Sequence, residues 1–165
     1  MRELEFLCLD CAADAVPTSP LSRALAHAEP GLGLRDLSLE VAKLDVRGAD
    51  VEDLDVEGDV VRTTPERALV FSSAREIDAL RTRLRQSGCF VIDMTGALAG
   101  LELRGETLMR RLTDLDLDAL PAVGSFAHVP ATVLRGGDDT FRVFFPQEYG
   151  HYVTEVVIDT AEGLA

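Results

Sequence analysis

Apolar residues recur at two spacings along the chain, and the two spacings predict strands and helices in alternation. A period of two, or a short apolar run between turn residues, predicts a strand. The strands predicted in this way cover residues 34–48, 59–63, 67–71, 90–94, 98–103, 125–134 and 141–145. Apolar residues three and four apart predict helices after Pro20, after Ser73, from Glu106 and from Pro146. This order favours an α+β fold in which helices cover a layered antiparallel or mixed sheet.

The predicted strand over 34–48 changes phase along its length. Leu37, Leu39 and Val41 fall on one face, and the apolar positions then shift to Leu44 and Val46. A phase change inside a strand indicates a bulge or a bend. We therefore expect one long bent strand here, or two strands joined.

The central helix has the clearest start signal. Ser73 and Glu76 have the spacing of a capping box, in which each side chain bonds to the backbone of the other residue. Ile77, Leu80 and Leu84 then share one apolar face. A shorter helix is predicted earlier in the chain. Serine is a favoured N-cap residue and proline suits the first helical position, so we expect Ser19 to cap this helix and Pro20 to begin it.

The C-terminal helix is predicted to begin at Pro146. Before it, Pro121–Gly124 are predicted to form a turn and Ser125–Leu134 a single strand. The buried stripe of the helix is predicted to comprise Tyr149, Tyr152, Val153, Val156, Val157 and Thr160. Both tyrosines would then anchor the edge of a core or an interface.

The chain is interpreted as a short extension, residues 1–17, followed by one domain, residues 18–165. The domain divides into possible βαββ-type halves, 18–88 and 89–165, each with a Leu-x-apolar-Arg-Gly motif: Leu44-Asp45-Val46-Arg47-Gly48 and Leu101-Glu102-Leu103-Arg104-Gly105. The repeat indicates an internal duplication, or only the recurring needs of a strand that ends in a turn.

Composition and charge limit the function. With 165 residues, 47% of them hydrophobic, the chain can bury one sizeable core. A net charge of −13, with Lys43 as the only lysine, makes nucleic-acid binding unfavourable. No run of 18 apolar residues predicts a membrane span, and the acidic N-terminus does not fit a signal peptide. Only three cysteines are present, so we expect a cytoplasmic protein.

No motif in the sequence predicts catalysis or metal binding. Cys8 and Cys11 have the spacing of half a zinc site or a redox pair, but no second ligand pair accompanies them. The acidic stretch 49–58 lacks the spacing of a calcium loop and is interpreted as a solvated surface loop. The motifs of nucleophilic enzymes and of phosphate-binding loops are absent from the sequence. We therefore assign no catalytic residue and no metal ligand.

Asp93 is the most unusual carboxylate in the sequence, because it interrupts the apolar strand over 90–94. A carboxylate in that position must face water or find a partner. We expect a hydrogen bond to the turn at Thr95-Gly96, with a ligand contact as the alternative.

Six short motifs, taken in order, are similar to those of one family. They are Ser19-Pro20-Leu21, Leu34-Arg35-Asp36-Leu37, Val91-Ile92-Asp93-Met94-Thr95, Leu101-Glu102-Leu103-Arg104-Gly105, Leu112-Thr113-Asp114-Leu115-Asp116-Leu117 and Asp139-Thr140-Phe141-Arg142-Val143. Over residues 18–160 the chain thereby resembles the gamma subunit of heterotetrameric sarcosine oxidase. That family is similar in turn to the folate-binding domain of aminomethyltransferases, the glycine cleavage T-proteins.

The resemblance implies a non-catalytic accessory subunit that packs against the large subunit of an oxidase. Flavins, NAD and zinc are held by other subunits of such complexes, so no cofactor is expected on this chain. The sequence departs from the family in having no tryptophan, and the acidic stretch 49–58 is local to it. The alternative is a free-standing module that binds folate or another small molecule, and that could form a homo-oligomer.

Five residues are candidate contacts to a partner or ligand. Asp93 interrupts a strand, and the other four lie at the predicted ends of elements. These four are Arg104, Asp116, Arg142 and Tyr149. For each, an ordinary surface or edge position is the competing interpretation.

Overall fold

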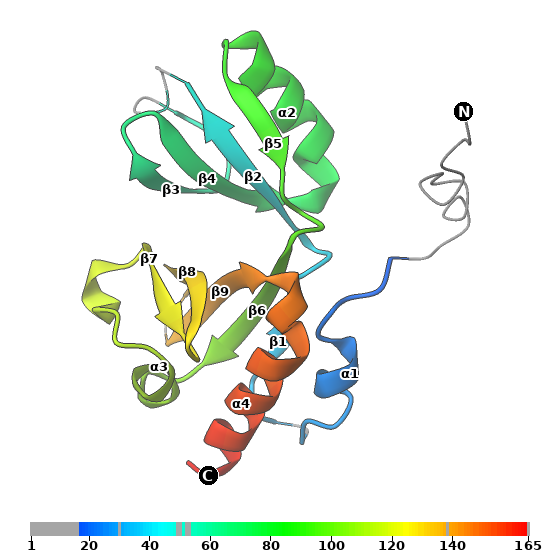
Figure 1. Cartoon of the computed structure of the whole chain (residues 1–165), viewed down its shortest axis with the longest axis vertical. Coiled ribbons are helices and arrows are strands. Elements are labelled where there is room, and N and C mark those ends of the chain that lie inside the picture. Colours follow the sequence, from blue (N-terminus) through cyan, green and yellow to red (C-terminus); the bar gives the residue numbers. More distant parts are fainter. Residues whose placement is uncertain (1–16, 30, 49–50, 52–53, 138, 165) are drawn as a thin grey trace, which may run out of the picture.

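Two antiparallel β-sheets, each covered by helices on one face, form the core of the protein (Figure 1). The computed structural model describes residues 17–29, 31–48, 51, 54–137 and 139–164. The five-stranded sheet has the order β1 (Arg35–Asp36), β6 (Leu98–Arg104), β9 (Thr140–Pro146), β8 (Val129–Arg135), β7 (Ala122–Phe126). The four-stranded sheet has the order β3 (Asp59–Thr64), β4 (Arg67–Ser73), β2 (Val41–Arg47), β5 (Phe90–Asp93).

The α-helices of the described residues are α1 (Ser22–Leu25), α2 (Ile77–Gln86), α3 (Glu106–Leu112) and α4 (Gly150–Glu162). Short 3₁₀ helices are η4 (Ala74–Glu76), η5 (Leu117–Ala119) and η6 (Gln147–Tyr149). No helix among the described residues is long and apolar enough to cross a membrane. The predicted α+β class is confirmed, and the strand pairings within the described residues are all antiparallel, so neither sheet is mixed.

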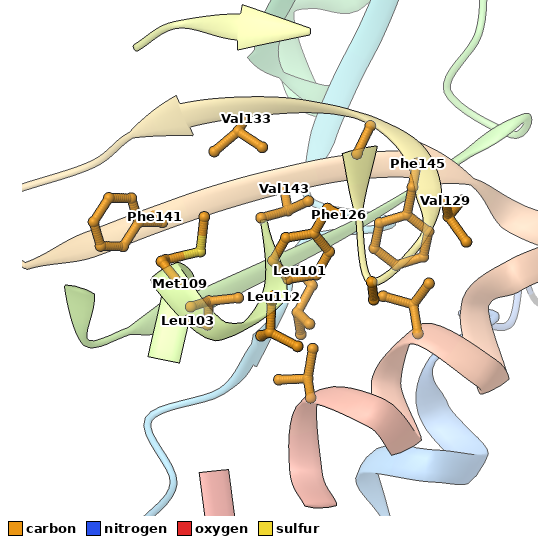
Figure 2. Close-up of a cluster of buried hydrophobic side chains, with 14 of the residues drawn as sticks. Leu101, Leu103, Met109, Leu112, Phe126, Val129, Val133, Phe141, Val143 and Phe145 are labelled. Atoms are coloured by element: carbon orange, nitrogen blue, oxygen red, sulfur yellow. The ribbon is translucent and has the colours of Figure 1, made fainter. Parts of the chain in front are cut away.

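One face of the five-stranded sheet packs against α1, α3 and α4 and forms an extended apolar core. Figure 2 shows part of it: Leu101, Leu103, Met109, Leu112, Phe126, Val129, Val133, Phe141, Val143 and Phe145. Val153 and Val157 of α4 are fully buried against the same face. Burying a side chain of this size stabilises a fold by about 1.5–3 kcal/mol, so this cluster holds the sheet to its helices.

The four-stranded sheet packs one face against α2. Leu44 and Val46 of β2 meet Leu80 and Leu84 of α2 in a second apolar cluster. Residues at alternate positions of β2 point to the opposite face. Lys43 and Asp45 therefore lie on the face turned away from α2.

The two sheets meet at a third, smaller cluster. The rings of Phe71 on β4 and Phe144 on β9 stack with centroids 4.3 Å apart and planes at 24°. Leu134 of β8 belongs to the same cluster. Gly100 permits this close approach, because a Cβ atom there would lie 2.9 Å from the Phe144 ring.

The range 34–48 contains two strands that belong to different sheets. β1 pairs with β6 and β2 pairs with β4 and β5, so the second expected arrangement, two joined strands, is present. The predicted alternation of Leu37 and Leu39 is wrong, since Leu37 is 3% exposed and Leu39 is 49% exposed. The backbone turns between Leu37 and Val41, with Leu39 inside the turn, and the Val41 N–H donates to the Leu37 carbonyl at 3.1 Å.

The single strand predicted over Ser125–Leu134 is wrong. The range holds the end of β7 and most of β8, which pair as a hairpin. Ala127 and His128 form its two-residue loop with φ of 48° and 65°. The predicted turn over Pro121–Gly124 is also wrong beyond its first residue, because Ala122–Gly124 are part of β7.

The C-terminal helix has a different start and a different buried face from those predicted. Pro146 ends β9, and η6 precedes α4. Tyr149 and Tyr152 are 42% and 45% exposed. The buried residues of α4 are Gly150, Val153, Thr154, Val157, Ile158 and Ala161. Val153 and Val157 are buried as predicted, whereas the rest of the buried face is formed by Thr154, Ile158 and Ala161 rather than by the tyrosines.

The predicted cap at Ser73 is present in altered form. Its hydroxyl accepts from the Arg75 N–H at 3.3 Å and starts η4, and α2 follows after Glu76. Leu80 and Leu84 are buried as predicted. Ser19 does not cap α1, but its hydroxyl accepts from the Leu21 N–H at 3.1 Å, just before that helix.

The proposed halves contribute to each other's sheets. β1 comes from 18–88 and joins the five-stranded sheet, whereas β5 comes from 89–165 and joins the four-stranded sheet. The repeated motif ends β2 in one sheet and β6 in the other. The internal duplication stays a prediction. Residues 1–16, which include the Cys8–Cys11 pair, lie outside the described residues.

The acidic stretch 49–58 is not wholly a solvated loop. Val51 is fully buried, and Leu54 and Val56 pack against the cluster beneath α2. Glu57 and Gly58 are exposed and lead into β3. The described part of the stretch therefore combines an apolar anchor with an exposed acidic end.

Candidate functional site at the junction of the two sheets

A cleft of about 390 Å³ opens beside the contact between the two sheets. Its size falls within the range of small-molecule sites. Five carboxylates and two guanidiniums line it: Glu40, Glu57, Asp59, Glu76, Glu102, Arg35 and Arg142. These groups carry a net charge of −3, so the cleft favours a cationic or hydrogen-bond-donating group.

Ion pairs bind the walls of the cleft together. Arg142 Nη1 on β9 lies 2.9 Å from Asp59 Oδ2 on β3, and this pair spans the two sheets. Arg35 contacts Glu40, and its Nη1 lies 3.8 Å from Glu102 Oε1. Exposed pairs of this kind contribute about 1 kcal/mol or less each, so they orient the side chains more than they stabilise the fold.

The rim of the cleft depends on a close backbone approach at Gly58. This residue has φ of 128°, and a Cβ atom there would lie 2.2 Å from the Phe71 carbonyl oxygen. Only glycine fits without a backbone shift. A smaller cleft of about 260 Å³ continues from this rim, sharing Glu57, Ser72 and Glu76 and reaching Arg83 of α2.

A buried lysine lies between the sheets, next to the cleft. Lys43 is 1% exposed, its Nζ donates to the Ser38 carbonyl at 2.5 Å, and Nζ lies 5.9 Å from the centroid of the Phe144 ring. Burial lowers the pKa of Lys43 to about 8, against the opposing charges of Asp36 and Asp93. Its ammonium is thus held with one direct hydrogen-bond acceptor among the described residues.

A buried aspartate lies one row further along the same face of the four-stranded sheet. Asp45 is 2% exposed, and it accepts from Arg47 Nη2 at 2.7 Å and from Arg67 Nε at 2.9 Å. Burial alone would raise the pKa of Asp45, but the hydrogen bonds and charges of Arg47 and Arg67 outweigh it and hold the pKa below its ordinary value. Asp45 is therefore ionised at neutral pH.

The cleft offers binding groups rather than an activated nucleophile. The hydroxyls of Ser72 and Ser73 line it, and none of the described histidines does. Within the described residues no group of three or more His, Cys, Asp or Glu side chains is arranged to hold a metal ion. The arrangement can hold a polar or cationic group between the two sheets.

Two of the sequence-predicted site residues have local structural roles. Asp93 Oδ1 accepts from the Thr95 N–H at 2.9 Å, the hydrogen bond to the turn that the sequence suggested, and Oδ2 lies 3.4 Å from Arg81 Nη1. Asp116 Oδ1 accepts from the Asp118 N–H at 3.1 Å and caps η5.

The other three predicted residues lie in different places. Arg142 lines the cleft between the sheets, whereas Arg104 lines a separate cleft of about 290 Å³ near the end of α4. Tyr149 is exposed in η6. None of the clefts described here is lined by more than one of the five residues, so the structure does not gather them into one site. Their role in contacts stays a prediction.

Sequence reasoning missed the buried charges of β2. Lys43 is the chain's only lysine and stands between Ala42 and Leu44 in an apolar stretch, a signal of the same kind as the one that singled out Asp93. Asp45 stands between Leu44 and Val46 and carries the same signal, but its partner Arg67 comes from another strand and cannot be identified from local sequence. The ring of carboxylates around the cleft likewise comes from separate segments.

Comparison with known proteins places the fold. No protein-family model and no curated protein match the sequence. The structure is similar to a chain of the heterotetrameric sarcosine oxidase from Corynebacterium sp. U-96 in complex with pyrrole 2-carboxylate, with a TM-score of 0.68 and 18% identity over 90% of this chain and 96% of that one.

The structure is also similar to the glycine cleavage system aminomethyltransferase T from Bartonella henselae, with a TM-score of 0.58 and 18% identity over 87% of this chain. The match covers 49% of that protein, so this chain spans about half its length. The chain thus has a fold similar to those of a sarcosine oxidase chain and of part of an aminomethyltransferase.

Proposed function

We propose that the chain is a non-catalytic accessory subunit of a heterotetrameric sarcosine oxidase-like complex, in which it packs against the large subunit and serves sarcosine catabolism in the cytoplasm. The observation that carries this proposal is the agreement in fold over 90% of this chain and 96% of the oxidase chain. The two chains have similar lengths as well as similar folds. A full-length agreement favours an equivalent role in an assembly over a shared local motif.

The second match points in the same direction. This chain corresponds to 49% of the aminomethyltransferase, so about half of that protein has no counterpart here. In the proposed assembly, the region that corresponds to this half supports a partner subunit. The flavin, NAD and zinc of the proposed complex would accordingly belong to the other subunits.

The test is co-expression with a large oxidase-like chain, which we expect to be encoded beside this one. With a tag on this chain, we expect the large chain to copurify at a fixed ratio and to carry the flavin. This chain purified alone should be colourless. One flavin per chain in that preparation would contradict an accessory role, and failure of the large chain to copurify would contradict membership of the complex.

The cleft between the sheets favours a second candidate function, a free-standing module that binds folate or another small molecule. Its volume of about 390 Å³ is adequate for part of such a ligand, and its two guanidiniums could meet a ligand carboxylate. Each guanidinium is already paired with a carboxylate of the protein, which places this function second. Calorimetric titration with tetrahydrofolate tests it. Saturable binding that Arg142→Gln removes would favour the module over the accessory subunit.

A further inference from the structure

The face of the four-stranded sheet turned away from α2 is covered only at one end. Phe71 and Lys43, near the five-stranded sheet, are buried at the contact between the sheets. At the other end of the same face, Arg67 of β4, Arg47 of β2 and Phe90 of β5 lie directly opposite one another in register. Phe90 is 64% exposed, the highest value among the exposed large apolar residues of the described chain.

Arg47 and Arg67, which lie opposite each other in this row of three residues, form an arrangement that is electrostatically unfavourable by itself. Like charges directly opposite each other on adjacent strands destabilise a sheet. Asp45, buried behind them, offsets this by accepting from Arg47 Nη2 at 2.7 Å and from Arg67 Nη2 at 3.0 Å. A buried carboxylate thus fixes both guanidiniums in place while their side chains stay 48% and 45% exposed.

Each guanidinium keeps hydrogen-bonding capacity toward solvent. Arg47 and Arg67 donate from Nε and Nη2 to Asp45, and their Nη1 groups make no hydrogen bond within the described residues. The cluster of Arg47, Arg67 and Asp45 carries a net charge of +1 on a chain of net charge −13. At physiological ionic strength the screening length is about 8 Å, so an approaching group responds mainly to this local positive charge.

We propose that the row of Arg67, Arg47 and Phe90 is the surface through which the chain docks on the large subunit, and that this partner presents a carboxylate beside an apolar side chain there. The inference rests on the proposed function and adds the surface and its chemistry. Arginine and aromatic residues dominate the binding energy of protein interfaces, and the preset guanidiniums match a carboxylate in two-point geometry. Tyr152 of α4, which is 45% exposed and lies outside this row, serves as a comparison site.

The experiment measures the affinity of the purified chain for the large subunit by biolayer interferometry. The variants are Phe90→Ser and Arg47→Gln; the latter leaves Arg67 as a partner for Asp45. The matched controls are Tyr152→Ser, which changes an exposed tyrosine on α4, and Arg23→Gln, which changes an exposed arginine on α1. Circular dichroism and thermal melts establish that each variant is folded.

We expect Phe90→Ser and Arg47→Gln each to weaken binding by tenfold or more, with both controls within twofold of the unaltered chain. Affinity should fall as salt rises from 50 to about 500 mM, because opposite charges meet at the interface. Arg47→Gln should flatten this salt dependence, and Phe90→Ser should leave it unchanged.

The outcomes separate the surface from the function. Binding of the unaltered chain that neither row variant weakens would overturn the surface and leave the proposed function standing. Binding that strengthens with salt would contradict a partner carboxylate at this surface and would overturn the inference. Self-association that Phe90→Ser abolishes would make a second copy the occupant and would also overturn the inference. If the unaltered chain does not bind the large subunit, the proposed function fails and the inference fails with it.

Discussion

Lys43 shows how one residue can make a sheet contact sensitive to pH. Its ammonium lies between the two sheets with the Ser38 carbonyl as acceptor, so folding removes a positive charge from water. The free energy of that removal is unfavourable unless nearby charges offset it. Asp36 and Asp93 offset part of it, and burial still lowers the pKa of Lys43 to about 8.

We expect the stability of the unaltered chain, relative to Lys43→Met, to rise between about pH 8 and pH 10.5. The pKa of Lys43 is about 8 in the folded chain and 10.5 ordinarily, so in this window the unfolded chain holds a proton that the folded chain has released. Raising the pH therefore favours folding. Urea unfolding of both proteins at pH 7 and pH 10 should show a relative gain on the order of 2 kcal/mol.

The comparison is clean because Lys43 is the only lysine in the chain. Other groups that titrate at high pH are common to both proteins and cancel in the difference. A stability difference that stays constant from pH 7 to pH 10 would contradict a buried lysine with a lowered pKa.

Asp45 should behave in the opposite sense. Its pKa is held below the ordinary 3.8, so its carboxylate stabilises the fold above that pH and the contribution is lost as pH falls through the folded pKa. We expect Asp45→Asn to destabilise the chain by roughly 1–3 kcal/mol at pH 7, because charge-assisted hydrogen bonds to Arg47 and Arg67 are lost. The loss should shrink in acid.

Chemical denaturation at pH 7 and in acid measures this effect. Asp78→Asn is the matched control, since the Asp78 side chain is 93% exposed and its pair with Arg81 is weak. It should change the unfolding free energy by about 0.5 kcal/mol or less. Equal effects of the two substitutions at pH 7 would show that the buried cluster adds nothing beyond an ordinary surface charge.

At the scale of elements, the segment between β1 and β2 decides which sheet each strand joins. Leu37 N–H donates to the Gly100 carbonyl at 2.8 Å, and the chain then turns so that Ala74 N–H can reach the Glu40 carbonyl at 2.9 Å. This turn passes the chain from β6 of one sheet to β4 of the other. A continuous strand could not satisfy both contacts.

We expect Leu37→Ala to destabilise the chain by about 2–4 kcal/mol and Leu39→Ala to have an effect of about 0.5 kcal/mol or less. Leu37 is 3% exposed in the cluster between the sheets, and Leu39 is 49% exposed. Removing a buried leucine side chain costs its transfer free energy and leaves a cavity. Thermal unfolding of both variants measures this. A single strand would place both leucines on one face and give similar losses.

The elements that sequence patterns predicted well are those set by local periodicity and turn chemistry. α3 begins at Glu106 as predicted, because Gly105 and an apolar face at Leu108, Met109 and Leu112 define it locally. The pairing of β3 with β4 follows equally from the turn at Pro65.

The hairpin between β7 and β8 could not be predicted in the same way. Its loop residues, Ala127 and His128, adopt left-handed conformations that normally favour glycine or asparagine. Ala127 is only 4% exposed, and its N–H donates to the Leu112 carbonyl at 2.7 Å, so packing and this hydrogen bond hold it in place. A tertiary contact rather than a turn signal therefore creates the loop. The buried charges of β2 and the cleft have the same origin in contacts between distant segments.

At the scale of the whole molecule, the two sheets form one unit through a small contact. Each sheet has its own helices and its own large apolar cluster, and the shared cluster centres on Phe71 and Phe144. Around it lie the Arg142–Asp59 ion pair and the hydrogen bond from Gly100 N–H to the Ser38 hydroxyl at 3.1 Å. The cleft exists because the sheets diverge from this contact.

Phe144→Ala should therefore weaken the coupling between the sheets as well as the total stability. We expect a loss of about 3–5 kcal/mol, because the ring is 1% exposed and stacks on Phe71. Native-state hydrogen exchange should show amides of β2 and β4 exchanging at a lower free energy than those of β6 and β9, since the four-stranded sheet has the smaller cluster of its own.

The control is Phe126→Ala, which removes a fully buried ring inside the five-stranded sheet. It should cost a similar free energy but affect β6 and β9 first. The same pattern of exchange in both variants would mean that the sheets unfold together and that Phe144 has no special place between them.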